Sequence, residues 1–184
     1  MNRKNKVFIA TSLDGYIAEK DGGLDWLNSD WLNLDSNTDD GGMGYEEFIN
    51  TIDALVMGRI TFETVKGFDV PWPYKKPVFV LSNTMIQIPK SHKEKAFLVK
   101  GDLKKVLRQI HEKGYCRLYI DGGTTISNFL KEDLIDEMTI TTIPTLLGGG
   151  YPLFHEMPNR LNFELVESKV YKGQIIQNHY KRVK

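Results

Sequence analysis

The sequence predicts a single α/β domain over residues 1–184, with a mixed, mainly parallel sheet, helices on both faces and an antiparallel C-terminal hairpin. Three observations support this prediction. Strand-like and helix-like segments alternate along most of the chain, and two strand-like runs follow one another at its end. A chain of 184 residues with 41% hydrophobic content is also long enough for one domain with a sizeable core.

Four short apolar runs predict buried strands, each followed by a polar or glycine-containing turn. They cover residues 7–12, 54–57, 78–81 and 118–120. Four segments with apolar residues three and four positions apart predict helices, over residues 45–52, 61–65, 103–110 and 126–130. Gly114 is expected to end the third helix.

The C-terminal third is predicted to be mostly β-structure. Residues 135–143 alternate in polarity as a strand does, and Pro144 lies at the end of this run. Residues 163–171 and 174–180 flank Lys172-Gly173, which is typical of a hairpin turn.

A polar stretch over residues 21–44, rich in Asp and Gly, lies between the first strand and the first helix. It is longer than most connections within a compact domain, and such loops commonly serve as lids or binding loops. Its aspartates lack the spacing of an EF-hand, so we expect a solvated lid rather than a calcium site.

Composition excludes several classes of function. Lys+Arg and Asp+Glu both number 24, which argues against nucleic acid or an acidic membrane as partner. The single cysteine, Cys116, and four well-separated histidines predict neither a disulfide framework nor a metal site. The N-terminus is basic, but the apolar stretch after it is too short for a signal core or a membrane span, so we expect a cytoplasmic protein.

Two predicted strands end in glycine and lead directly into a helix. In Asp121-Gly122-Gly123-Thr124-Thr125, the glycines allow a ligand to approach closely, and the helix start attracts anions. A tight turn without a ligand is the alternative. Met57-Gly58-Arg59-Ile60-Thr61 repeats the pattern with a cation that suits a phosphate, although a solvated surface arginine would look the same. Two such strand ends in one sheet favour a dinucleotide.

Several ordered motifs then resemble a known family. Residues 12–18 (SLDGYIA) resemble the opening of the C-terminal reductase domain of bacterial riboflavin-biosynthesis proteins, and residues 57–63 (MGRITFE) resemble a segment of dihydrofolate reductase. Residues 120–123 (IDGG) with Phe129-Leu130 resemble the cofactor loop of both. Residues 134–137 (LIDE), 143–150 (IPTLLGGG) and 152–154 (PLF) resemble the riboflavin-type protein. The chain is thus similar to the dihydrofolate-reductase-like family, in its riboflavin-reductase branch.

The resemblance implies a dihydrofolate-reductase-like fold over the whole chain, NADPH as cofactor and a homodimer. Carried over by motif, Arg59 would face the adenosine 2′-phosphate and Ala10 would lie near the nicotinamide. The complete set of implied cofactor-binding residues is Ala10, Trp26, Gly58, Arg59, Thr61, Ser82, Asn83, Gly122, Gly123, Thr124 and Thr125.

The chain also departs from the family pattern. Counted back from Met57 without gaps, the position of the folate-binding acid of dihydrofolate reductases falls on Gly42, which argues against folate reduction. A small gap would instead bring one of Asp40, Glu46 or Glu47 to this position. The helix segment Phe48-Ile49-Asn50-Thr51 lacks the arginine that holds a ribose phosphate in riboflavin-type reductases. Where those proteins often carry Glu before the glycine loop, this chain has Asp121.

The sequence therefore predicts an NADPH-dependent reductase that acts on a C=N or C=O bond of a small heterocycle, pyrimidine-like or pterin-like. Asp14 and Asp121 are the candidates for the substrate side. For Asp14 the alternative is a structural role in the Asp-Gly turn. For the whole protein the alternative is an NADPH-binding module or sensor without turnover.

Overall fold

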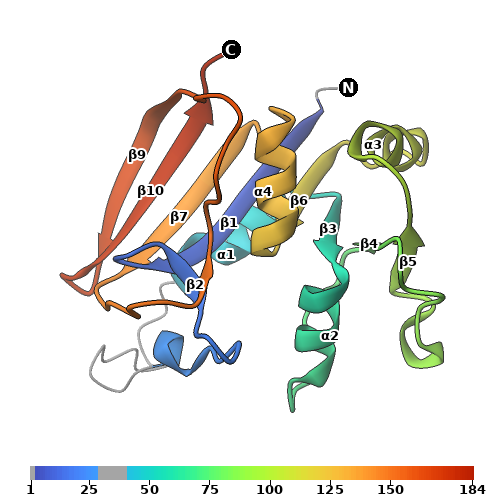
Figure 1. Cartoon of the computed structure of the whole chain (residues 1–184), viewed down its shortest axis with the longest axis horizontal. Coiled ribbons are helices and arrows are strands. Elements are labelled where there is room, and N and C mark those ends of the chain that lie inside the picture. The colour runs from blue at the N-terminus through green and yellow to red at the C-terminus, as the bar shows by residue number, and fades with distance from the viewer. Residues whose placement is uncertain (1–2, 29–40) are drawn as a thin grey trace.

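A computed structural model describes residues 3–28 and 41–184 and contains an eight-stranded sheet in the order β5-β4-β3-β6-β1-β7-β10-β9 (Figure 1). Its strands are β1 (Lys4–Ser12), β3 (Ala54–Gly58), β4 (Val78–Leu81), β5 (Ala96–Val99), β6 (Arg117–Asp121), β7 (Glu137–Ile143), β9 (Phe163–Tyr171) and β10 (Ile175–Arg182). A second, two-stranded sheet pairs β2 (Tyr16–Ala18) with β8 (Tyr151–Pro152).

The pairing confirms the mixed, mainly parallel sheet. All neighbours from β5 to β7 run parallel, whereas β10 is antiparallel to both β7 and β9. Lys172 and Gly173 form the turn of the hairpin with positive φ angles of 51° and 72°. This left-handed geometry matches the twist of paired strands, which explains glycine at the second position.

Four α-helices connect the strands: α1 (Gly41–Asn50), α2 (Arg59–Gly67), α3 (Leu103–Glu112) and α4 (Gly123–Lys131). Short 3₁₀-helices cover Asp25–Asn28 (η1) and Lys90–His92 (η3). Within the described ranges, no helix is long and apolar enough to cross a lipid bilayer.

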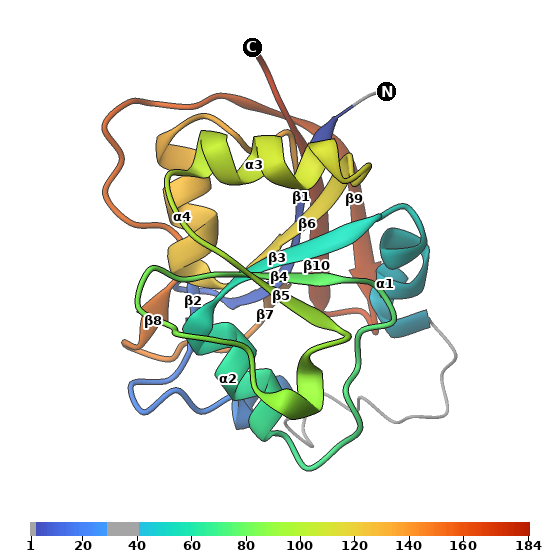
Figure 2. The same cartoon turned by 90° about the vertical axis from the view of Figure 1, so that its right-hand side faces the viewer.

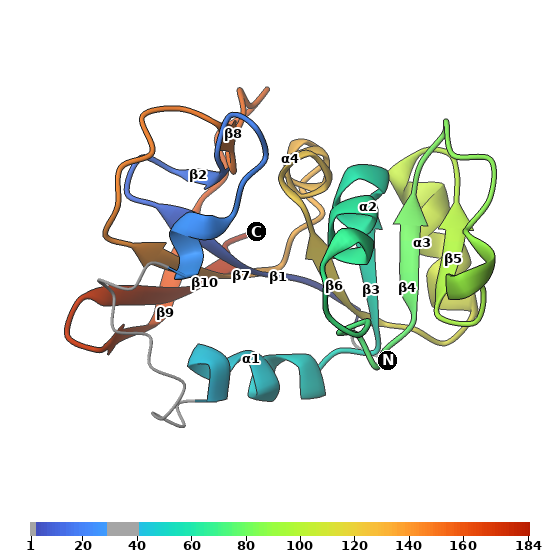
Figure 3. The same ribbon diagram turned by 90° about the horizontal axis from the view of Figure 1, so that it is seen from below.

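The helices cover both faces of the sheet, as expected. In two perpendicular views, α1 and α4 lie on opposite sides of it (Figures 2 and 3). On the α4 side, Ile126 and Phe129 pack with Leu118 and Ile120 of β6 in one buried cluster, together with apolar residues of α3. On the α1 side, a second cluster includes Leu55 and Met57 of β3 and Phe62 of α2. Successive side chains of a strand point to opposite faces of the sheet, so the same strands contribute residues to both clusters.

The structure corrects several element boundaries. β1 begins at Lys4, three residues before the predicted start, and the edge strand β5 was not predicted. The first helix starts at Gly41 rather than Tyr45, and its first turn is kinked, with positive φ at Gly42, Met43 and Gly44. Part of the expected lid, residues 29–40, lies outside the described residues.

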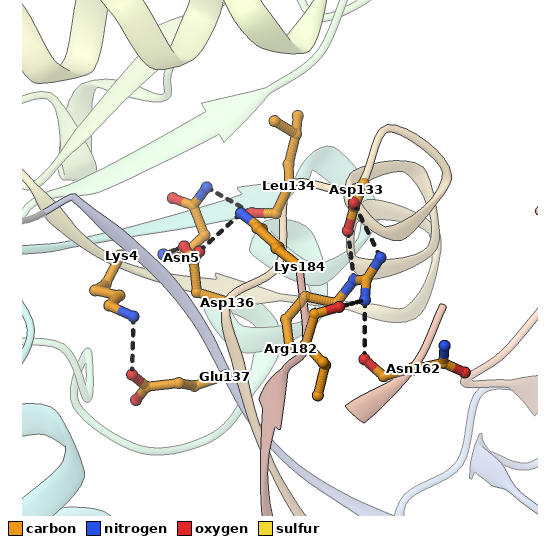
Figure 4. Close-up of polar contacts among 10 residues, drawn as sticks. Lys4, Asn5, Asp133, Leu134, Asp136, Glu137, Asn162, Arg182 and Lys184 are labelled. Carbon is orange, nitrogen blue, oxygen red and sulfur yellow. Dashed lines mark hydrogen bonds and ion pairs between the residues drawn. The ribbon is translucent and has the colours of Figure 1, made fainter. Parts of the chain in front are cut away.

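Polar contacts fasten the last strand to the amino-terminal edge of the sheet (Figure 4). The Arg182 guanidinium donates to both carboxylate oxygens of Asp133, at 2.7 and 3.1 Å. The Asn5 backbone N–H donates to Asp136 at 2.9 Å, and the Asn5 side-chain amide donates to the Leu134 carbonyl at 2.7 Å. These contacts fix the ends of β1, β7 and β10 relative to one another.

Candidate functional site

A cavity of about 1010 Å³ opens at the edge of the sheet where the parallel strands end. This is the edge at which α/β proteins bind their ligands. Of the residues predicted for the site, all but Asp14 and Trp26 line this cavity: Ala10, Gly58, Arg59, Thr61, Ser82, Asn83, Asp121, Gly122, Gly123, Thr124 and Thr125. Segments far apart in the sequence thus meet in one space.

The sheet itself is open at the cavity. β1 pairs with β6 from Lys4 to Lys6, and the last pair joins Lys6 to Tyr119. Beyond it, β1 pairs with β7 alone up to Ser12, whereas β6 pairs with β3 up to Asp121. The two central strands therefore separate toward the carboxyl edge, and Ala10 of β1 and Asp121 of β6 both line the cavity there.

The amino-terminal ends of α2 and α4 meet at the cavity. A Cβ atom on Gly122 would lie 2.2 Å from the Thr61 hydroxyl oxygen, and one on Gly58 would lie 3.0 Å from that of Thr125. Neither helix has a side-chain cap on its first turn. Uncapped N–H groups and the positive ends of two helix dipoles make this edge suitable for a phosphate-bearing ligand.

Arg59 is the first residue of α2, and its guanidinium lies 2.7 Å from the Glu63 carboxylate one turn later. Both side chains are 42% exposed, so the guanidinium remains accessible to an anion. Ser82 and Asn83 follow β4. The Ser82 hydroxyl accepts from the Met85 N–H at 3.0 Å, and the Asn83 side chain accepts from the Gly101 N–H at 3.0 Å. Both residues therefore shape the loops that wall this part of the cavity.

Asp121 ends β6 and is partly buried in the cavity wall. One carboxylate oxygen accepts from the Gly122 N–H at 2.8 Å, and the other lies 3.5 Å from the Tyr74 hydroxyl. Burial raises the pKa of Asp121 to about 6, although the Gly122 N–H and the Tyr74 hydroxyl act in the opposite direction. The Tyr119 hydroxyl donates to the Phe8 carbonyl at 2.8 Å. Perturbed carboxyl groups in a cavity are typical of functional sites.

Asp14 lies outside the cavity lining and occupies a structural position. Its carboxylate accepts from the Ser12 hydroxyl at 2.6 Å and from the N–H groups of Leu147 and Gly148 at 3.1 and 2.8 Å. These hydrogen bonds lower the pKa of Asp14. These contacts match the structural alternative for Asp14, since its carboxylate holds its own turn and also the loop that contains Leu147 and Gly148.

Trp26 is 5% exposed and packs in a buried cluster with Ile143 and Ile175. Ala10 and Leu27, which line the cavity, pack against the same cluster. In this structure Trp26 therefore supports the cavity wall from behind.

The structure also adds residues that sequence analysis missed. Ile17, Pro152 and His155 line the cavity, and Tyr74 lies behind Asp121. Ile17 lies inside the motif of residues 12–18, so that motif could have indicated it as a site residue. Tyr74 follows α2 in an irregular segment without a motif, so no local pattern indicated it. α1 contributes no lining residue among those described.

Comparison with known proteins agrees with this geometry. The family model of the RibD C-terminal domain matches residues 4–177. The chain belongs to the RibD C-terminal domain family. Its structure matches that of a Shewanella sp. PV-4 protein, whose name refers to riboflavin biosynthesis, with a TM-score of 0.92 at 51% identity over 98% of this chain and 99% of the other.

A sequence relative and a second solved structure extend the comparison. The uncharacterized protein YwjB of Bacillus subtilis (strain 168) is 39% identical over 99% of both chains. A dihydrofolate reductase from Enterococcus faecalis, solved in complex with NADP(H), superposes with a TM-score of 0.65 at 16% identity, covering 98% of this chain and 97% of its own. At that identity the likeness concerns the fold, which is therefore dihydrofolate-reductase-like.

Proposed function

We propose that the protein is an NADPH-dependent reductase that acts on a C=N or C=O bond of a small heterocycle. The observation that carries this proposal is the convergence of two uncapped helix starts on one cavity, at the point where β1 and β6 separate. A pyrophosphate suits the helix starts, and a flat ring suits the gap between the strands. Membership of the RibD C-terminal domain family supports the same reaction class.

The residues present fit the cofactor. Backbone N–H groups of α4 and the hydroxyls of Thr61, Thr124 and Thr125 would hold the pyrophosphate, and Arg59 would bind a 2′-phosphate. When bound, the reduced nicotinamide supplies a hydride. Around it, the chain's own residues orient the ring and exclude water, because Ile9, Ile17 and Leu27 form apolar parts of the wall.

We also propose that the protein forms a homodimer through the hairpin. Leu165, Val170 and Ile176 share the face of the sheet on which Met138 is buried, yet they are 57%, 63% and 45% exposed. No described helix covers β9 and β10 on this side (Figure 1). An apolar strip of this kind is self-complementary in a twofold contact.

The test of the reductase proposal is NADPH binding followed by NADPH oxidation with pteridines, pyrimidines and quinones. We expect a dissociation constant for NADPH below that for NADH, and oxidation with a heterocycle of one class. Arg160→Ala, a change at an exposed position that does not line the cavity, serves as the control. Tight NADPH binding without turnover on any class would favour a sensor module, and absence of binding would contradict both functions.

A further inference from the structure

The positive and negative charges of the chain are equal in number but unevenly distributed. Residues 75–117 contain eleven Lys and Arg and only three Asp and Glu, and all of these basic residues except Lys76 are exposed. The segment comprises β4, β5 and α3, and β4 and β5 lie at the end of the sheet opposite β9 and β10 (Figure 1). We call its basic side chains the basic edge: Lys75, Lys76, Lys90, Lys93, Lys95, Lys100, Lys104, Lys105, Arg108, Lys113 and Arg117.

Few ion pairs neutralise the basic edge. Within the part of the chain that the structure describes, Arg117 is its only member in an ion pair, with Asp53. By contrast, at least seven of the 13 Lys and Arg outside residues 75–117 are paired. The positive field of the basic edge therefore extends into solvent.

α3 carries its lysines where they cost stability. Lys104 and Lys105 lie in the first turn, at the positive end of the helix dipole, which favours acidic residues. Lys104 and Arg108 are four positions apart, so their charges repel each other along one face. Asp102 caps the helix by accepting from the Lys105 N–H at 2.8 Å, and a glutamate at position 105 would complete a capping box. Departures from such local rules are expected where a function requires them.

α3 begins at the rim of the cavity. Gly101, Asp102 and Leu103 line the cavity and lead directly into Lys104 and Lys105. A Cβ atom on Gly101 would lie 3.8 Å from Cδ of Lys105, so this side chain extends along the rim. No member of the basic edge lines the cavity itself. The basic edge is thus continuous with the cavity mouth without being part of the binding surface.

The cavity wall offers little long-range attraction to an anion. Among the described residues, its lining contains two basic and four acidic side chains: Arg59, Lys131, Asp21, Asp102, Asp121 and Glu132. Arg59 is moreover paired with Glu63. The starts of α2 and α4 suit a phosphate, but a helix dipole acts only within about one turn of its end. Attraction from a distance must come from charges outside the wall.

We propose that the basic edge steers the anionic cofactor to the cavity and sets the rate at which NADPH binds. This inference rests on the proposed function. The 2′-phosphate of NADPH carries about 1.5–2 negative charges at neutral pH, in addition to those of its pyrophosphate. Fields of one sign beside a cleft raise association rates by about 10- to 10³-fold. Because its residues do not line the cavity, the basic edge acts on association and leaves dissociation nearly unchanged.

The first test measures the association rate constant of NADPH by stopped-flow, through energy transfer from protein tryptophan to the reduced nicotinamide. The rate constant should fall steeply with salt, because the screening length shortens from about 30 Å at 0.01 M to about 3 Å at 1 M. NADH lacks the 2′-phosphate, so its rate constant should fall less steeply. An NADPH rate constant that salt does not change would overturn the inference.

The second test reverses two charges at the rim. Lys104→Glu combined with Lys105→Glu should lower the association rate constant about tenfold or more at low salt, with convergence to the wild type near about 1 M salt. The same variant should unfold at a higher urea concentration, because both changes satisfy the helix preferences, so slower binding would not reflect a damaged fold. Lys169→Glu combined with Lys181→Glu, at exposed positions of β9 and β10, makes the same change in net charge and should retain the wild-type rate.

The outcomes distinguish this inference from the proposed function. Equal slowing in both double variants would mean that net charge alone sets the rate, and would overturn the inference. An unchanged rate constant with aggregation of the rim variant would also overturn it, since the lysines would then only keep the edge strand β5 from pairing with other chains. Salt-dependent NADPH binding without turnover would support steering and contradict the reductase. A wild-type protein that does not bind NADPH would overturn both.

Discussion

Arg59 begins α2 at the cavity wall and forms an ion pair with Glu63 one turn later. NADPH differs from NADH by a 2′-phosphate, so a guanidinium at this point would select between the two cofactors. We expect Arg59→Ala to weaken NADPH binding about tenfold to hundredfold, because a charge-assisted pair contributes on the order of 1.5–3 kcal/mol. NADH affinity should change far less. Dissociation constants for both cofactors measure this difference.

The same ion pair also predicts a variant that binds NADPH more tightly. Glu63→Gln keeps the size of the side chain but removes the competing charge, so Arg59 becomes more available to phosphate. Exposed pairs contribute about 0.2–1 kcal/mol, which predicts roughly a 1.4- to 5-fold gain in NADPH affinity, lost at high salt. An equal gain for NADH would contradict the assignment of Arg59 to the 2′-phosphate.

Gly122 combines two requirements, a positive φ of 87° and a close approach to Thr61. Gly122→Ala should therefore both destabilise the protein and prevent NADPH binding. Gly15 is a matched control, since its φ is 82° and nothing lies within 4 Å of an added Cβ. Gly15→Ala thus measures backbone strain alone, on the order of 1 kcal/mol. Urea unfolding should show a larger loss for Gly122→Ala, partly recovered in the double variant with Thr61→Ala.

At the scale of elements, Asp53 joins the starts of β3 and β6. Its carboxylate accepts from the backbone N–H groups of Cys116 and Arg117 at 3.0 and 2.8 Å, and from the Arg117 guanidinium at 2.6 Å. The guanidinium and the N–H groups lower the pKa of Asp53 to about 2. The contribution to folding is therefore complete above pH 4 and disappears as pH falls toward about 2.

We expect Asp53→Asn to lower the free energy of unfolding by about 1–3 kcal/mol at pH 7. The difference from the wild type should narrow as pH falls below 4, because protonation removes the same charge from Asp53. Chemical denaturation across this range measures it. Asp69→Asn, at an exposed position, should show no such convergence. A difference that stays constant with pH would mean that the charge of Asp53 contributes nothing.

Sequence patterns predicted the central elements well for a physical reason. The strands β3, β4 and β6 are buried on both faces and are read as continuous apolar runs, and the spacing of Leu103, Val106 and Ile110 marks α3. β5 was missed because it is a four-residue edge strand with Phe97 exposed, paired to β4 alone. The two-residue β8 is specified by its contact with β2, which no local pattern reports.

The part of the candidate site that depends on backbone geometry was predictable, because short motifs indicate that geometry. A glycine directly before a predicted helix indicated two strand ends that suit a phosphate, and the glycines at both ends line the same cavity. The burial of individual side chains was not predictable in the same way. From sequence alone, a tryptophan in a polar loop fits a ligand contact and a core position equally well. Trp26 lies in the core. The contact of Tyr74 with Asp121 spans 47 residues, and no spacing rule indicates it.

At the scale of the whole molecule, the apolar strip of β9 and β10 predicts the assembly. We expect a dimer by light scattering, and Leu165→Lys with Val170→Lys should convert it to a monomer without unfolding it, because both side chains are already more than half exposed. Lys169→Gln, on the opposite face of β9, should remain dimeric. A wild-type monomer at high concentration would contradict the proposed dimer.

The separation of β1 from β6 divides the sheet into two four-stranded halves joined along the pairs of residues 4–6 with 117–119. This seam lies at the edge opposite the cavity, so a slight rotation about it would change the width of the cavity gap more than any other dimension. The Asn5 side chain donates from β1 to the Leu134 carbonyl, and the Leu134 N–H bonds to Phe129 of α4, which packs on β6 on the other side of the seam. We therefore expect Asn5→Ala, though remote from the ligand, to weaken NADPH binding mainly through faster dissociation, which stopped-flow kinetics would measure.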